Sequence, residues 1–387
     1  MKSQHLFANK QYTQFVLTMV TALIGGTSFM MMQLPIPWLL GPMISVLIAS
    51  NVWKAHYGLP RQVRDTGMII VGYTIGLSLT AKALQEMSHL LPSMLLMTML
   101  LMLLCSGMAY AVSKLARIDY LTVLMGSIPG GLTQVLALAQ ETEEVNITVV
   151  TVMQVIRLMT IIICVPALIF SPVFGNRQAE ALATQVTSVA HANAASIFPN
   201  LLIFGVVCIV FALVGNKIRF PTAYLLGPAI GTACLQMVGL SGPTLPYVLI
   251  NAAQFMIGAY VGLLLKPGEL THKLRTISLA IISSLLLVSG ALGFSLLLTK
   301  FQPISMSTAL LSLSPGGMDQ MSLIAHVVHA DLSMVAGFQL FRMMFILFII
   351  PPLLRPMIKS ARRKMLAEKD HTKPANAALD KVFLTFV

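Results

Sequence analysis

The sequence predicts an all-α polytopic membrane protein made of two inverted-topology repeats, with about ten transmembrane helices and two re-entrant or broken Pro-Gly-Gly segments. Hydrophobic residues make up 57% of the 387 positions, charged residues make up 10%, and the mean hydropathy is +0.84. Soluble proteins carry about 25% charged residues. The alternating pattern of a membrane β-barrel does not occur, so the spans are expected to be helices.

Two motifs that contain glycine and proline occur twice at one spacing. The Leu-Leu-Gly-Pro motif of 39–42 recurs at 225–228, and the Pro-Gly-Gly motif of 129–131 recurs at 315–317, each after 186 residues. Because separate motifs keep this register, the chain is interpreted as a duplicated unit. Both motifs are expected to break helices, since proline removes a backbone donor and glycine lets the chain turn.

Each copy is expected to hold six apolar segments. In the first copy these cover 13–33, 35–52, 62–80, 88–113, 119–140 and 145–172, and the second copy repeats them about 186 residues later. Six stretches, near 13–33, 88–113, 145–172, 196–215, 276–299 and 331–354, are long enough to cross a bilayer. The expected organisation is a first membrane repeat (1–172), a connector (173–195), a second membrane repeat (196–355) and a basic cytoplasmic tail (356–387).

The charges in the loops indicate that the two copies have opposite orientations. Lys54, Arg61 and Arg64 are assigned to the loop between the second and third segments, whereas the matching loop of the second copy, 240–246, carries no charge. Positively charged loops face the cytoplasm. Opposite orientation requires an odd number of crossings in each copy, so one of the six segments must be re-entrant. The segment with Pro-Gly-Gly is the candidate, because a straight helix would break there.

The basic tail indicates a cytoplasmic C-terminus in a multi-pass protein of the bacterial inner membrane. From Arg355 onward the chain holds eight Lys and Arg against three acidic residues. A basic cluster after a last transmembrane helix binds anionic lipid, and a tail this short holds no folded nucleic-acid reader. The expected partners are the lipid bilayer and a small-molecule or ion substrate, without direct nucleic-acid contact. A homo-oligomer is left open.

Arg157 and Arg342 are the first candidates for function, because each lies in the middle of an otherwise apolar segment. A charge at that depth costs at least about 2.5 kcal/mol, so it must be paired or face water. One interpretation is a structural pair that locks helices together. The other is a symmetric site that holds the charge of a substrate.

The Pro-Gly-Gly motifs add backbone donors to the second interpretation. A helix that restarts after such a motif presents unsatisfied N–H groups, which attract anions. The alternative is a kink that serves packing alone. The residues expected to bind substrate are Arg157, Arg342, Gln134, Gln320, Gln154, Gln339, Gly130, Gly131, Gly316 and Gly317.

Asp319 and His326 are the candidates for ion or proton coupling. Asp319 stands where the first copy has Thr133, and a carboxylate beside a broken helix can bind a cation, pair with an arginine, exchange a proton or cap the helix. His326 lies near His329 and can transfer a proton or simply form a polar helix end. Two histidines make a poor metal site, so no metal and no cofactor are expected.

The repeated motifs resemble those of the membrane AbrB family over roughly residues 13–355. The resemblance is carried by the two Leu-Leu-Gly-Pro motifs, the Pro-Gly-Gly motifs at Pro129 and Pro315, and the stretch from Ala330-Asp331 to Gln339 and Arg342. The first copy departs from it by having Asn146 where Asp331 stands. The resemblance implies a duplicated membrane unit, and the family's labels imply regulation of gene expression or ammonia monooxygenase activity.

The expected function is secondary transport of a small anionic solute by alternating access, with ion or proton coupling and no enzymatic step. The alternative is a membrane-embedded regulator that acts indirectly on gene expression. An oxygenase comes third, because copper chemistry needs clustered histidines and only His326 and His329 lie close in the sequence.

Overall fold

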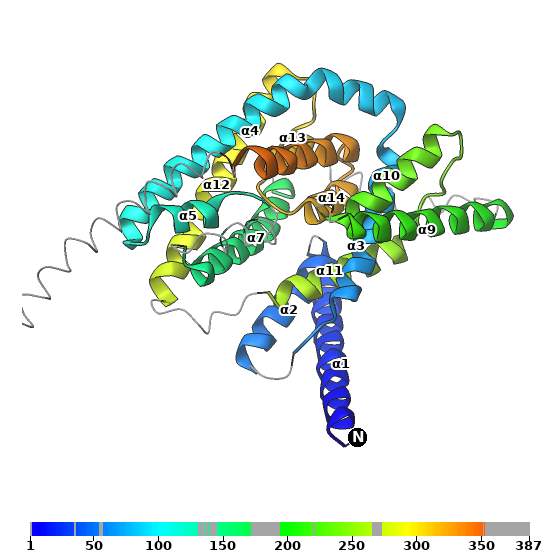
Figure 1. The fold of residues 1–387 in the computed structure, drawn as a ribbon, viewed down its shortest axis with the longest axis horizontal. Coiled ribbons are helices and arrows are strands. Elements are labelled where there is room, and N and C mark those ends of the chain that lie inside the picture. Colours follow the sequence, from blue (N-terminus) through cyan, green and yellow to red (C-terminus); the bar gives the residue numbers. More distant parts are fainter. Residues whose placement is uncertain are drawn as a thin grey trace, which may run out of the picture.

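A computed structural model of the chain is helical throughout the residues it describes (Figure 1). These residues are 2–34, 36–53, 57–130, 145–171, 194–218, 222–264 and 273–350, with isolated positions at 135, 139, 220 and 352. The expected connector lies almost wholly outside the described residues, and so does the basic tail. Gly131, Thr133 and Gln134 also lie outside them.

The helices follow the predicted segments in both halves of the chain. The first half contains α1 (Lys2–Met31), α2 (Pro37–Val52), α3 (Arg61–Ser78), α4 (Ala81–Ala116), α5 (Tyr120–Ser127) and α7 (Ile147–Ile169). The second half contains α9 (Ala194–Lys217), α10 (Ala223–Met237), α11 (Tyr247–Gly262), α12 (Lys273–Phe301), α13 (Met306–Leu313), α14 (Met318–Val327) and a helix at Leu332–Ile350.

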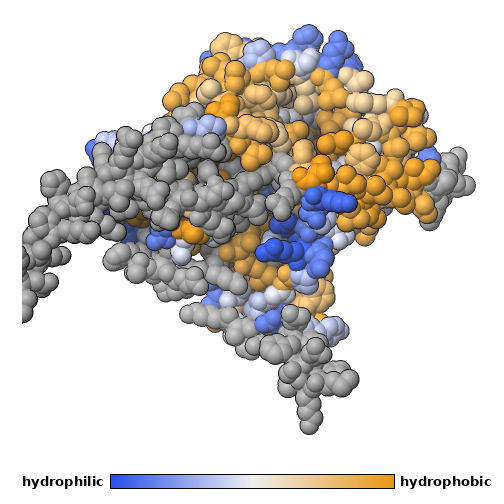
Figure 2. Space-filling view, viewed as in Figure 1, coloured by the Kyte–Doolittle hydropathy of each residue, from blue (hydrophilic) through white to orange (hydrophobic). Residues whose placement is uncertain are grey.

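Five helices of the described residues are long and apolar enough to cross a membrane. They comprise Tyr12–Met31, Ala81–Ala116, Ile147–Ile169, Arg275–Phe301 and Leu332–Ile350. The sixth expected stretch, 196–215, falls within α9, whose apolar part spans Leu202–Lys217. Apolar residues dominate the surface over α9 (Figure 2). The chain is therefore a helical protein with the features of a membrane protein.

The helices gather into two bundles, each with members from both halves of the chain (Figure 1). Bundle A consists of α1, α2, α3, α9, α10 and α11, in which α3 packs on α10 and α11 packs on α2. Bundle B consists of α4, α5, α7, α12, α13 and the helix Leu332–Ile350. α14 lies between the bundles, because it packs on α13 and α7 of bundle B and on α3 of bundle A.

Glycines set the close crossings in bundle A. A Cβ added at Gly72 of α3 would lie 2.3 Å from the carbonyl oxygen of Leu225. A Cβ at Gly258, the equivalent position of α11, would lie 2.4 Å from the carbonyl oxygen of Leu39. Small residues let helix backbones approach in a membrane, where packing replaces the hydrophobic effect as the driving force. The same crossing thus joins α3 to α10 and α11 to α2.

The expected helix breaks at Gly41-Pro42 and Gly227-Pro228 are wrong. α2 and α10 run through both prolines and begin earlier, after Ile36 and Thr222, whose backbones are left-handed. Each proline is the sixth residue of its helix and removes one i→i−4 hydrogen bond, a loss that membrane helices tolerate. The glycine serves packing instead, because a Cβ at Gly41 would lie 2.4 Å from the carbonyl oxygen of Gly25.

The breaks predicted at the Pro-Gly-Gly motifs are confirmed. α5 ends at Ser127, two residues before Pro129, and α13 ends at Leu313, two residues before Pro315. Helical structure resumes at Met318, with Gly317 as the N-cap of α14. Two short helices therefore end inside the protein.

Substituting valine for Gly72 or Gly258 should destabilise the protein by about 1–3 kcal/mol or more, because the new side chain meets the backbone of the facing helix. The measurement is the fraction of folded protein that survives heating, followed by size-exclusion chromatography in detergent. Gly107→Val in α4 is the matched control, since a Cβ at that position meets nothing within 4 Å. Equal losses in Gly107→Val and Gly72→Val would contradict the packing role.

Candidate functional site

The predicted arginines lie beside the two broken helices. Arg157 is in the middle of α7 and is 5% exposed, and Arg342 is in the middle of the helix Leu332–Ile350 and is 4% exposed. Each arginine reaches the C-terminal end of the short helix of its own half, α5 or α13. These ends would otherwise leave carbonyl groups without partners.

Arg157 and Gln154, one turn apart on α7, together satisfy the end of α5. Arg157 Nη2 also donates to Gln154 Oε1 (2.8 Å), which fixes the two side chains against each other. The carbonyl acceptors of Arg157 Nη1 are Gly126 (3.4 Å), Ser127 (3.0 Å) and Ile128 (2.7 Å), and those of Gln154 Nε2 are Met125 (2.8 Å) and Ile128 (3.2 Å). We call this arrangement the first clamp.

Arg342 and Gln339 repeat the arrangement at the end of α13. Arg342 Nη2 donates to Gln339 Oε1, as in the first clamp. The carbonyl acceptors are Leu313 (3.2 Å) and Ser314 (3.0 Å) for Arg342 Nη1, Gly316 (3.5 Å) for Arg342 Nη2, and Leu311 (2.8 Å) and Ser314 (3.1 Å) for Gln339 Nε2. We call this the second clamp. The Gln-x-x-Arg spacing therefore places both donors on one face of a helix, toward the break.

The two clamps lie close enough for their charges to interact. Arg157 and Arg342 repel each other, and the fully buried Cys105 of α4 lies within electrostatic range of both. In the part of the chain that the structure describes, the ion pairs are Arg64–Asp65 and Lys82–Glu86, so no carboxylate pairs with either clamp. The partial negative charge at the C-terminal ends of α5 and α13 offsets part of the two charges.

The first clamp keeps unused polar atoms. Arg157 Nε and Ser127 Oγ are both buried and have no hydrogen-bond partner in the structure. A buried polar group without a partner costs about 1–3 kcal/mol. A guanidinium N–H and a hydroxyl that are left over beside two positive charges are chemically suited to an anion.

Asn146 and Asp331 are helix caps. Asn146 Oδ1 accepts from the Val149 N–H (3.2 Å), and Asp331 Oδ1 accepts from the Met334 N–H (3.1 Å). Both residues start the helices that carry the clamps. Because an amide oxygen and a carboxylate oxygen cap equally well, the difference between the copies at this position is neutral for the fold.

Asp319 and Gln320 sit at the start of α14, where the chain resumes after Pro-Gly-Gly. Gln320 Nε2 donates to Asp319 Oδ2 (3.0 Å), and Gln320 is 3% exposed. Gly317 is in close contact with the Gln320 side chain, since a Cβ at Gly317 would lie 1.9 Å from Gln320 Oε1. The structure thus places these predicted residues at the interface of α14 with α3 rather than within the clamps.

His326 lies farther along the same face of α14. Asp319, Leu323 and His326 are four and three residues apart, which aligns them on a helix. Leu323 and His326 line a narrow crevice with residues of α3 and α11, including Val71. His326 is half-buried and His329 is exposed, so the two do not form a common site in this structure.

The remaining predicted glycines belong to the breaks. The Gly130 N–H donates to the Ile128 carbonyl (2.8 Å), which turns the chain after α5, and the Gly316 carbonyl accepts from Arg342.

Sequence reasoning missed two roles. It did not identify the carbonyl ends as the partners of the arginines, although a Gln-x-x-Arg pair after each break was a usable signal. It also assigned Arg64 to a loop, whereas Arg64 lies in the first turn of α3.

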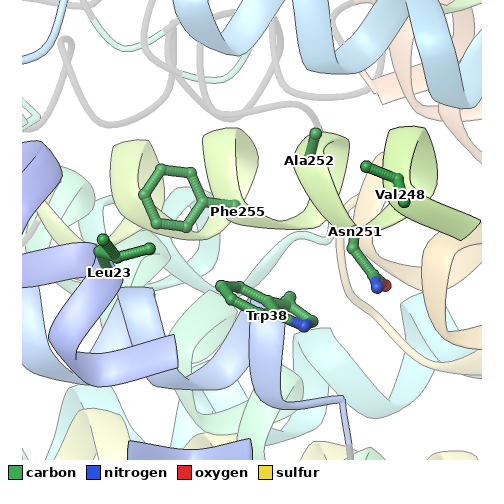
Figure 3. Close-up of a pocket in the computed structure, with 6 residues that line it drawn as sticks. All are labelled: Leu23, Trp38, Val248, Asn251, Ala252 and Phe255. Carbon is green, nitrogen blue, oxygen red and sulfur yellow. The ribbon is translucent and has the colours of Figure 1, made fainter. Parts of the chain in front are cut away.

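A cavity of about 370 Å³ lies away from the clamps, between α1, α2 and α11 (Figure 3). Its lining residues are Leu23, Trp38, Val248, Asn251, Ala252 and Phe255. The lining is mainly apolar, and Leu23 and Val248 are exposed on the surface of the helices. None of the predicted site residues contributes to it, so it does not mark the predicted site.

Gln154→Met and Gln339→Met should each lower the free energy of unfolding by about 1–3 kcal/mol, because each removes the glutamine donor of a buried carbonyl, that of Met125 or Leu311, and the acceptor of the arginine Nη2. The two losses should be of similar size, since the clamps are alike. The measurement is thermal survival in detergent. Gln85→Met on the exposed surface of α4 is the control, and it should change little. A neutral Gln154→Met would show that the clamp does not stabilise the break.

Comparison with known proteins gives a family assignment. The family model described as "Transition state regulatory protein AbrB" matches residues 4–357. The chain is 28% identical to "Putative regulator AbrB" of Escherichia coli (strain K12) over 342 residues, which cover 88% of this chain and 96% of that protein. It is 24% identical to "Uncharacterized protein YhjN" of Bacillus subtilis (strain 168) over 350 residues, covering 86% of this chain and 90% of that protein. The resemblance expected from the sequence is confirmed, and the chain belongs to the AbrB family.

Proposed function

We propose that the protein is a secondary transporter that moves a small anion across the membrane by alternating access. The observation that carries the proposal is the pair of buried arginines, Arg157 and Arg342, which have no carboxylate partner among the described residues. Buried charge inside a membrane protein is expensive and marks substrate or ion pathways. Two such charges that repel each other favour an anion between or beside them.

The hydrogen bonds of the clamps occupy part of each arginine but do not neutralise its positive charge. Backbone carbonyls occupy Nη1 of both arginines, so these donors serve the fold first. The carbonyls carry partial charge only, whereas each guanidinium carries a full positive charge. Arg157 Nε and Ser127 Oγ stay unused. We propose these two groups, with the net charge of both clamps, as the anion-binding elements. Gln134 and Gly131 remain proposed contributors from the sequence.

The arrangement of the helices supports alternating access. Transporters built from inverted repeats place their sites at interrupted helices near the membrane midplane, where one group of helices moves against another. Here both breaks belong to bundle B, and α14 joins bundle B to bundle A. We propose that the halves are inverted repeats with five crossings each, that the Pro-Gly-Gly segments are re-entrant, and that the bundles move against each other.

We further propose that the protein resides in the bacterial inner membrane as a multi-pass protein, with lipid and a small solute as its partners. No enzymatic step, cofactor or direct nucleic-acid contact is part of this proposal. Among the described residues no three histidine, cysteine or carboxylate side chains lie together as a candidate metal site.

The alternative is a membrane-embedded regulator, because the Escherichia coli relative carries the name of a regulator. A membrane protein that depletes or imports a metabolite also changes gene expression indirectly. The two functions differ in one measurable respect, since a transporter moves solute in a purified system and a pure sensor does not.

The test is solute flux into proteoliposomes that contain the purified protein. The probes are radiolabelled acetate, lactate, succinate, sulfate and phosphate, each offered separately under an imposed pH or sodium gradient. At least one anion should accumulate, and Arg157→Gln and Arg342→Gln should reduce the flux by about tenfold or more, because one missing charge-assisted contact costs about 1.5–3 kcal/mol. Arg275→Gln is the matched control, since Arg275 is exposed at the start of α12.

Ser127→Ala separates binding from folding. The Ser127 hydroxyl has no partner in the structure, so its removal should leave thermal stability unchanged or slightly higher. If the hydroxyl contacts the anion, the apparent KM for the transported anion should rise while the amount of folded protein stays constant. Normal flux in both arginine variants would remove the clamps from the mechanism, and no flux with any probe would favour the regulator.

A further inference from the structure

We propose that Asp319, Arg64 and Asp65 form a site for one proton at the interface between the two bundles, and that this site couples the proposed transport to a proton gradient. Only the coupling to transport rests on the proposed function, and the proton site itself does not. Arg64 and Asp65 are in α3 of bundle A, and Asp319 is in α14, which packs on bundle B. Any movement of one bundle against the other changes the distances within this group.

The charges of the group do not balance. Arg64 contributes one positive charge, whereas Asp65 and Asp319 contribute two negative charges when both are ionised. Arg64 bonds to Asp65 with Nε (3.1 Å) and Nη2 (2.9 Å), and its guanidinium lies 5.0 Å from the centre of the Tyr260 ring. One excess negative charge remains on the group, and one proton neutralises it.

The contacts of Asp319 are those expected of a protonated carboxyl group. Arg64 is near enough for its charge to act on Asp319, yet it forms its ion pair with Asp65, and Asp319 accepts from Gln320 Nε2 (3.0 Å). An ionised carboxylate gains by pairing directly with a guanidinium, and Asp319 forms no such ion pair among the described residues. The observed arrangement therefore fits a neutral Asp319 beside an Arg64–Asp65 pair.

The oxygen atoms around Gly317 supply a second, independent observation. Gln320 Oε1 is buried and has no hydrogen-bond partner. Gln320 Oε1 and Asp319 Oδ1 both lie within 2.7 Å of the point that a Cβ at Gly317 would occupy. Both oxygens therefore lie beside the same glycine, and Gln320 Oε1 has no donor. A proton on Asp319 supplies that donor, and it also does so if the amide of Gln320 is turned over, since an amide oxygen then faces Asp319 Oδ2.

The symmetry-related set of positions carries no charge. The positions equivalent to Arg64, Asp65 and Asp319 in the other copy are occupied by Ile250, Asn251 and Thr133. Arg64 and Asp65 come from the first copy and Asp319 from the second, whereas the symmetry-related combination of Ile250, Asn251 and Thr133 carries no charged side chain. A duplicated scaffold that needs one proton per cycle requires one such group.

The remaining charged and titratable groups around Asp319 are few. In the described residues, α3 presents Arg64 and Asp65, α11 presents Tyr260 beneath Arg64, and α14 carries His326 seven residues farther along. α13 contains no ionisable residue, and the charge of α7 is Arg157, which is engaged in the first clamp. When the proton leaves to water, Asp319 becomes an anion, and Arg64 is drawn from Asp65 toward α14. No other bond forms or breaks.

The experiment is infrared difference spectroscopy of the purified protein as the pH is stepped, with no solute present. The wild type should show the carbonyl stretch of a buried carboxylic acid, which disappears as the pH rises. The band should be lost in Asp319→Asn. Asn251→Ala, at the position equivalent to Asp65, is the matched control and should leave the band and its midpoint unchanged.

Substitutions of Arg64 and of Asp65 should shift the titration midpoint of Asp319 in opposite directions. Arg64→Gln removes a positive charge that favours the ionised carboxylate, so the midpoint should rise. Asp65→Asn releases Arg64 to pair with Asp319, so the midpoint should fall. Each shift should be on the order of one pH unit, a tenfold change in proton affinity. A structural ion pair alone would not produce shifts of opposite sign.

The outcomes separate this inference from the proposed function. A wild type without the band, a band that persists in Asp319→Asn, or two shifts of the same sign would overturn the proton site. If a variant fails to fold, Asp319→Glu provides a second reading, because it keeps a titrating carboxyl with an altered midpoint. Anion flux that loses its response to a pH gradient in Asp319→Asn supports the coupling. A correct infrared result with no flux of any probe leaves the proton site standing and removes transport.

Discussion

A helix that ends inside a membrane protein leaves carbonyl groups where water is scarce, and the two breaks of this protein depend on how those groups are satisfied. α5 and α13 end beside Pro-Gly-Gly, and in each case a glutamine and an arginine from the following long helix donate to the exposed carbonyls. The clamps explain why a charged residue is tolerated in the middle of α7 and of the helix Leu332–Ile350. The second clamp also bonds to the Gly316 carbonyl, just before the start of α14.

A second constraint is the close contact between helices of the two halves. α3 crosses α10 at Gly72, and α11 crosses α2 at Gly258, so the halves of the chain do not form separate bodies. Each bundle instead contains equivalent helices from both halves. The consequence is that the breaks lie together in bundle B, whereas α3, with Arg64 and Asp65, lies in bundle A. Only this exchange of helices brings a charged pair of the first half against α14 of the second.

Much of the fold could be predicted from the sequence, because hydropathy fixes where helices lie and motif spacing fixes which helices correspond. The positions of α1, α4, α7 and α12 follow from apolar length, and the breaks at Pro129 and Pro315 follow from proline and glycine. The Leu-Leu-Gly-Pro motifs were misread because local propensity cannot distinguish a proline that stops a helix from one that a helix accommodates. The partners of Arg157 and Arg342 could not be read from the sequence, since backbone carbonyls carry no sequence signal. Arg64 was placed in a loop because a charge at the start of a helix looks the same as a charge before it.

The two kinds of polar site in the protein obey different symmetry, and this difference bears on mechanism. The clamps are present in both halves with the same donors and with equivalent carbonyl acceptors for most of their bonds, as a scaffold that serves both breaks requires. The group of Arg64, Asp65 and Asp319 occurs once, since the equivalent positions in the sequence hold Ile250, Asn251 and Thr133. These charges are not needed to form the helix, because α11 forms at the equivalent place without them. A feature that is needed once per molecule, and that spans the junction between two bundles, is what a coupling step demands and a purely structural contact does not.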